Sequence, residues 1–133
     1  MNRVFKRAAA LTAGLTLVIG CGSSAQDIPT EDVQSAILER IRGEKGTLRL
    51  ENPSSGEPVD LSFERVHESV KRTPGGRFVA CVDFLGPEST VYDVDYFVRF
   101  ADGEYRVADV VMHKAGGESV LSADERAGLE SAR

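Results

Sequence analysis

Three side chains carry the chemistry of a nucleophile or a transition-metal ligand: the thiol of Cys81 and the imidazoles of His67 and His113. A thiol attacks a substrate when a neighbouring imidazole takes up its proton. The strand pairing predicted below places Cys81 on one face of a sheet and both histidines on the other. We therefore expect Cys81 to be a small buried hydrophobic residue, and we predict no catalytic residue.

The same pairing separates His67 from His113 by three strand spacings, about 14 Å in all. One metal ion does not bridge that distance in a flat sheet, although strong curling would bring the rings closer. A single histidine at a strand end is usually a hydrogen-bonded boundary residue. We predict neither a metal site at this pair nor any cofactor.

Three aspartates, Asp83, Asp93 and Asp95, form a second candidate site. The predicted pairing places Asp83 across from Asp93, with Asp95 two residues along on the same face. Such carboxylates repel one another unless a cation or a base lies between them, and a hard cation such as Ca²⁺ prefers oxygen ligands. The spacing matches no calcium-binding loop, and Arg99 offers partial neutralisation. A cation site and a solvated acidic face therefore both stay open.

Tyr96 and Asp109 form a third candidate site. The predicted pairing places them opposite each other on the face that we assign to a helix. A carboxylate there must be hydrogen-bonded or must line an opening, because an unpaired buried charge costs several kcal/mol. These two residues are the candidates for a pocket between helix and sheet.

One helix followed by antiparallel strands must position these candidates. Apolar residues at helical spacing predict a helix over about 31–42, with Thr30 as its cap and Gly43 as its stop. The period then changes to two, which predicts strands over 47–51, 59–70, 77–85, 91–100 and 104–114. Asp102-Gly103 suits a two-residue type I′ hairpin, which pairs Val98 with Val107. The predicted fold class is α+β, one N-terminal helix packed on a four- to five-stranded antiparallel sheet.

Residues 1–20 have the pattern of a signal peptide. Basic residues in 1–7 precede an uncharged run over 8–20, which is shorter than the roughly 18–20 residues that a membrane-spanning helix needs. Val18-Ile19-Gly20-Cys21 resembles the bacterial lipobox. The resemblance implies cleavage before Cys21 and acylation of Cys21, including palmitate, so that lipid anchors the exported protein to the membrane. A plain secretory signal is the alternative.

The charge balance restricts the partners of the exported protein. Residues 1–20 carry basic but no acidic side chains, so their removal makes the formal net charge more negative than −5. An acidic surface repels phosphate backbones, so we predict no nucleic-acid partner. The membrane is reached through the lipid on Cys21, and an envelope protein is the expected partner. Gly22 rather than aspartate follows Cys21. By resemblance to the general sorting rule for lipoproteins, this implies that, in a host with an outer membrane, the protein is anchored to the periplasmic side of the outer membrane.

The chain thus divides into a signal peptide (1–20), a lipidated tether (21–29), an α+β domain (30–115) and a C-terminal tail (116–133). In the tail, Ser122-Ala123-Asp124-Glu125 has the form of a capping box, so a short helix and a frayed tail are both open.

The order of a helix and then strands is similar to the cystatin-like and nuclear-transport-factor-2-like architectures. Four segments also resemble a group of small bacterial secreted proteins for which no activity is known: Val66-His67, Ala80-Cys81-Val82-Asp83-Phe84, Tyr92-Asp93-Val94-Asp95-Tyr96-Phe97 and His113-Lys114. The inhibitory Q-x-V-x-G loop of cystatins is absent. We expect a non-enzymatic binding or assembly domain at the cell envelope. The alternative is a nuclear-transport-factor-2-like enzyme with a pocket between helix and sheet.

Overall fold

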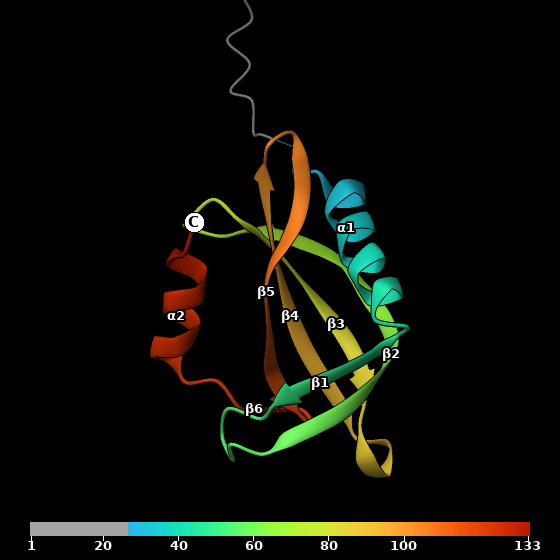
Figure 1. Cartoon of the computed structure of the whole chain (residues 1–133). Coiled ribbons are helices and arrows are strands. Elements are labelled where there is room, and N and C mark those ends of the chain that lie inside the picture. The colour runs from blue at the N-terminus through green and yellow to red at the C-terminus, as the bar shows by residue number, and fades with distance from the viewer. Residues whose placement is uncertain (1–26) are drawn as a thin grey trace, which may run out of the picture.

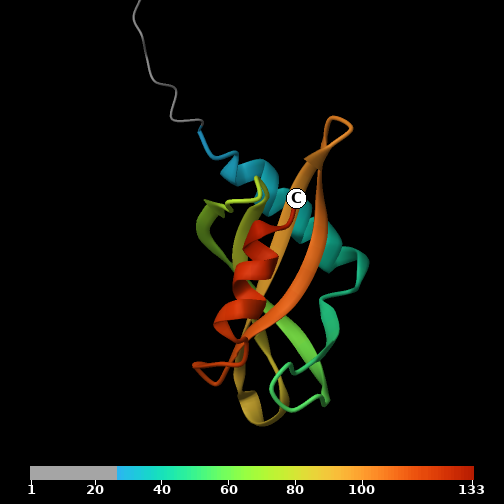
Figure 2. The same ribbon diagram turned by 90° about the vertical axis from the view of Figure 1, so that its left-hand side faces the viewer.

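The computed structural model describes residues 27–133, and the predicted signal peptide and Cys21 lie outside them. Helix α1 (Thr30–Gly43) packs on one face of a six-stranded antiparallel sheet, and a second helix, α2 (Ala123–Ser131), lies over the other face (Figure 1, Figure 2). This arrangement confirms the α+β class. Within residues 27–133, no helix is both long and apolar enough to cross a membrane.

The sheet is a meander in which each strand pairs with the next along the chain. Its strands are β1 (Thr47–Glu51), β2 (Pro58–Arg72), β3 (Phe78–Leu85), β4 (Val91–Ala101), β5 (Glu104–Ala115) and β6 (Glu118–Ser119), with a 3₁₀ turn, η1 (Pro87–Ser89), before β4. The prediction of four to five strands missed β6, because two residues are too short to show a period. The predicted fold class counted one helix, and of the two alternatives left open for the tail, the short helix is present as α2, with the capping box at Ser122 and Glu125.

Helix α1 forms because its apolar residues repeat every four positions. Val33, Ile37 and Ile41 are the residues that it buries, at 0%, 0% and 4% exposure. The predicted cap is wrong: Thr30 is already helical, Pro29 takes the cap position, and the Thr30 hydroxyl donates to the Ile28 carbonyl instead. The helix begins one residue earlier than the pattern indicates, so Thr30 cannot receive the first free N–H groups.

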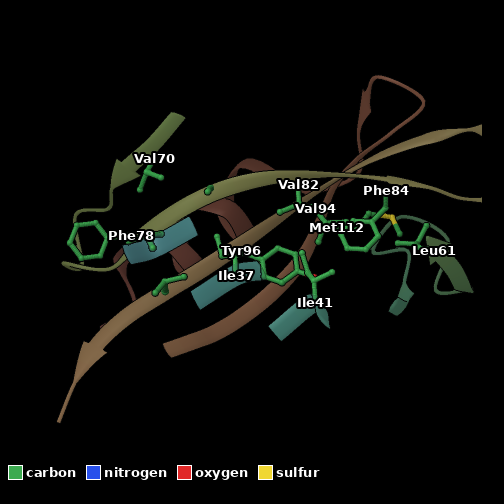
Figure 3. Packing of buried hydrophobic residues seen from close by; sticks show 13 residues of the cluster. Ile37, Ile41, Leu61, Val70, Phe78, Val82, Phe84, Val94, Tyr96 and Met112 are labelled. Carbon is green, nitrogen blue, oxygen red and sulfur yellow. The ribbon is translucent and has the colours of Figure 1, made fainter. Parts of the chain in front are cut away.

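The core lies between α1 and the sheet (Figure 3). Phe84 and Tyr96 stack with ring centroids 6.3 Å apart, and both are buried beside Ile37 and Ile41. The predicted helix-facing residues that are buried here are Phe78, Ala80, Val82, Phe84, Val94, Tyr96 and Val98. This face is closed by apolar side chains.

The pairing of β4 with β5 begins as predicted and then shifts twice. Asp102 and Gly103 have φ angles of 54° and 78°, as a type I′ turn requires, and Val98 pairs with Val107. Beyond that pair, Ala108 is an extra residue on β5, so Tyr96 pairs with Val110 and Phe97 with Asp109. The predicted pairing of Tyr96 with Asp109 is therefore wrong. One bulged residue moves all later side chains to the other face.

A second extra residue, His113, lies between the pairs Val94–Met112 and Asp93–Lys114. Met112 precedes this second shift and enters the core because of the first one, at 1% exposure, in the place that the prediction gave to Val111. The first shift also turns Asp109, Val111 and His113 toward α2.

The length of the turn between β2 and β3 determines on which face of the sheet His67 lies. The prediction paired Arg72 with Arg77, but the turn is one residue longer and Arg72 pairs with Phe78. The Thr73 N–H donates to the Arg77 carbonyl over 2.8 Å, which fixes that length. A slip of one residue exchanges the faces, so His67 lies on the same face as Cys81, and the predicted separation of the two is wrong.

Candidate functional site

A cavity of about 270 Å³ lies on the sheet face beneath α2. Strands β2 to β5 form its floor, and Arg126 of α2 contributes to its wall. Most of its lining side chains are ionisable: His67, Lys71, Cys81, Asp93, Asp95, His113, Lys114 and Arg126. This face therefore contrasts with the apolar face beneath α1 and is the candidate site.

Asp83 lies at one side of the cavity and has two basic partners. Arg65 Nε donates to its Oδ2 over 2.8 Å, and His67 Nε2 lies 2.7 Å from its Oδ1. Burial opposes ionisation of Asp83, but the hydrogen bonds and charges of Arg65 and His67 outweigh burial and lower its pKa below the usual value. Asp83 is therefore a carboxylate whose Oδ1 faces the histidine.

Asp95 lies across from Cys81 and has its own basic partners. His113 Nδ1 is 3.4 Å from Asp95 Oδ2, and Arg126 Nη1 donates to His113 Nε2. Because arginine has no acceptor, this contact requires Nε2 to accept and places the ring proton on Nδ1, toward Asp95. Burial raises the pKa of Asp95, although its basic neighbours His113 and Arg126 partly oppose the rise. Helix α2 is thus held to the sheet through a histidine.

Cys81 is half-buried between these two groups. Burial raises the pKa of its thiol to about 12, and the nearby charges of Asp95, Asp93 and Asp83 add to the rise. A thiol with that pKa is protonated at neutral pH and makes a poor nucleophile. The environment of Cys81, rather than distance from His67, is what opposes Cys–His catalysis.

Arg77 holds the C-terminal end of α2 to the sheet. This residue was not identified from the sequence. Its side chain is 3% exposed, contacts the Asp109 carboxylate, donates to the Leu129 carbonyl and lies 4.6 Å above the Phe97 ring centroid. The only sequence signal was an arginine directly after the Gly75-Gly76 turn. Arg77 therefore joins the sheet to the last turn of α2.

Gly75 makes the second contact with the end of α2. Its N–H donates to the Glu130 carbonyl over 2.9 Å. A Cβ at Gly75 would lie 2.1 Å from the Ala132 carbonyl oxygen, so only glycine allows this approach.

The three predicted aspartates are close in the sheet but do not share one partner. Asp83 pairs across the strands with Asp93, as predicted, and Asp95 pairs with Cys81. The bases beside Asp83 and Asp95 come from β2, β5 and α2 rather than from Arg99, the predicted neutralising residue. A cation site made of the three aspartates stays a prediction.

The structure does not bring Tyr96 and Asp109 together. Tyr96 is fully buried on the α1 face, whereas Asp109 lies on the α2 face with a side chain 47% exposed. The Tyr96 hydroxyl has no hydrogen-bond partner among residues 27–133.

Comparison with known protein families gives no match for this chain. No curated protein and no solved structure matches it either.

Proposed function

We propose that the protein is an exported, lipid-anchored binding domain of the bacterial cell envelope, without enzymatic activity, whose ligand site is the cavity beneath α2. The lipobox-like segment at Cys21 and the uncharged run before it support the anchor. An anchored domain of this kind acts at the membrane surface, on a ligand or an envelope protein that comes within reach of its tether.

The observation that carries the proposed binding role is the set of ionisable side chains in one cavity of about 270 Å³. Both acidic and basic side chains line it, and its thiol is protonated, so the cavity suits recognition of a small charged ligand better than nucleophilic attack. The enzyme alternative has less support, since it needs a pocket between helix and sheet with Asp109 or Tyr96 inside it, and Asp109 lies on the α2 face while Tyr96 is fully buried in the apolar core. The cystatin-like architecture is part of this proposal, supported by one long helix across an antiparallel meander.

Metabolic labelling with a fatty-acid analogue tests the anchor. We expect Cys21→Ser to abolish labelling and to leave uncleaved precursor or released protein. Cys81→Ser is the matched control and should keep the label, because it changes the other cysteine of the chain. Label on the Cys21→Ser variant would overturn the anchor.

Membrane fractionation tests the final location. In a host with an outer membrane, we expect the protein in that membrane because Gly22, rather than aspartate, follows Cys21. Recovery in the inner membrane would contradict this location.

Thermal melts of the full chain with small charged compounds test the cavity. We expect a bound compound to raise the melting temperature, and Arg126→Gln to abolish that rise. Arg106→Gln is the control, because Arg106 lies in the β4–β5 hairpin, pairs with Glu104 and does not line the cavity. An equal rise in both variants would place the compound elsewhere.

A further inference from the structure

We infer that His67, Cys81 and Asp83 form a binding site for a zinc-class divalent metal ion at the edge of the cavity. This inference rests on the proposed binding role, which it deepens by naming the class of ligand. One nitrogen, one sulfur and one oxygen ligand atom from these side chains all lie within 4.8 Å of one another.

The fold brings these ligands together from two neighbouring strands. Cys81 and Asp83 alternate along β3 and so share a face, and the β2–β3 turn places His67 on that face. Between Val66 and Val70, β2 carries two more residues than the opposing stretch of β3, so Arg65 pairs with Asp83 and His67 keeps its face, with its Nε2 2.7 Å from Asp83 Oδ1. The site is therefore set by backbone pairing rather than by a flexible loop.

The donor types select the metal. Imidazole and thiolate prefer zinc-class ions, whereas Ca²⁺ and Mg²⁺ prefer sets made only of oxygen. Zn²⁺ binds nitrogen at about 2.0 Å and sulfur at about 2.3 Å in a tetrahedron, which places ligand atoms about 3.3–3.6 Å apart. His67 Nε2 and Asp83 Oδ1, which are 2.7 Å apart, must separate by about 0.6 Å as the metal replaces their hydrogen bond, and any pair near the 4.8 Å limit must close by about 1 Å. The fourth position is left for water or for a ligand from solution.

Arg65 supports Asp83 from the outside of this site. Its Nε holds Asp83 Oδ2 at 2.8 Å, which leaves Oδ1 directed at His67 Nε2. Such a partner orients a metal-binding carboxylate without touching the metal. Arg65 is therefore a positioning residue, and its side chain is 70% exposed, so a variant should fold.

Metal binding requires the loss of protons. The Cys81 S–H bond breaks as the sulfur–metal bond forms, and His67 Nε2 must be free of its proton to donate its lone pair. The Cys81 proton passes to solvent, the neutral His67 ring carries its proton on Nδ1, and no oxidant or reductant is needed. Asp83, Asp93 and Asp95, whose charges disfavour the thiolate, favour a cation at the same place.

Zinc affinity of the full chain carrying Cys21→Ser, purified in detergent, tests the site. This background leaves Cys81 as the only thiol and removes the lipid, so its outcome does not depend on the anchor. We expect one zinc per chain by competition with a chromophoric chelator. Cys81→Ser and His67→Gln should each weaken binding at least about 100-fold, and Arg65→Gln about 10-fold.

Asp60→Asn is the matched control, because Asp60 is an exposed carboxylate of β2 that pairs with Arg49 and does not line the cavity. It should leave zinc affinity unchanged. Cobalt provides a second readout: we expect a thiolate-to-cobalt charge-transfer band and strong tetrahedral bands that disappear in Cys81→Ser. Zinc binding that survives both Cys81→Ser and His67→Gln, a weak octahedral cobalt spectrum, or no saturable binding would overturn the site.

Discussion

The α1 face and the α2 face of the sheet hold their helices by different forces. Helix α1 buries Val33, Ile37 and Ile41 in the core, whereas α2 buries none of its residues. Helix α2 is held by polar contacts: Arg126 to His113, and the carbonyls of Leu129 and Glu130 to groups of the β2–β3 turn. Burial of apolar area stabilises a fold strongly, whereas polar contacts stabilise it only modestly. The contacts of α1 therefore contribute more to the free energy of unfolding than the contacts of α2.

We expect the largest loss of stability from a substitution at the centre of the α1 face. Phe84→Ala should lower the free energy of unfolding by about 3–5 kcal/mol, because a cavity forms beside Tyr96. Urea unfolding measures it. Phe100→Ala, at a position that is 58% exposed, should stay within about 0.5 kcal/mol. Similar costs for both variants would contradict the assignment of the core.

On the α2 face, Asp109→Ala should cost about 1–3 kcal/mol, because the buried guanidinium of Arg77 loses its charged partner. Thermal melts and urea unfolding measure this cost. A neutral or raised melting temperature would show that Arg77 is satisfied without Asp109.

Gly75→Ala should release α2 while the sheet stays folded. The new Cβ overlaps the Ala132 carbonyl, and the strain should cost about 1–2 kcal/mol. Hydrogen exchange should quicken in α2 but not in β3 or β4. Gly43→Ala, where a Cβ meets nothing within 4 Å, is the control. Uniformly faster exchange would mean that α2 is part of the main folding unit.

The ion pairs of Asp83 predict a pH dependence. Its pKa is lowered in the folded state, so its stabilisation is complete above the unfolded pKa of about 3.9 and is lost as pH falls through the folded pKa. Asp83→Asn should cost about 1 kcal/mol at pH 7 and nothing in strong acid. Asp60→Asn, at an exposed pair with Arg49, should cost less than about 0.5 kcal/mol throughout.

The smallest effect is expected for Gly128→Ala, which should stabilise the protein rather than destabilise it. A Cβ at Gly128 meets nothing within 4 Å, and alanine favours a helix over glycine by up to about 1 kcal/mol. The variant should slow hydrogen exchange in α2 alone. Faster exchange there would contradict the position of Gly128 within the helix.

The sequence was sufficient for the strands and for the β4–β5 turn, because alternating apolar residues and Asp102-Gly103 specify them locally. It was not sufficient for the bulges of β5. Val110, Val111 and Met112 are all apolar, so either alternation buries a hydrophobic residue and the pattern does not show the shift.

Only part of the candidate site could be predicted, again because the sequence does not show the register shifts. Its β3 and β4 members, Cys81, Asp83, Asp93 and Asp95, were placed on one face because β3 pairs with β4 without a shift. The two histidines were placed on the wrong face, because the length of the β2–β3 turn and the bulge at Ala108 depend on tertiary contacts. Arg77 was missed because its partners lie 32 and 52 residues away along the chain.

The bulge at Ala108 also affects which insertions and deletions strand β5 can accept. Along β5, the residues that face the core have odd numbers at Tyr105 and Val107 and even numbers at Val110 and Met112. A deletion of Ala108 would only remove the extra residue and leave Asp109 and Met112 on their present faces, whereas a deletion of Val110 would turn Met112 out of the core. Codon insertions and deletions at the paired positions of this strand should therefore be lost by selection far more often than point substitutions at its exposed positions.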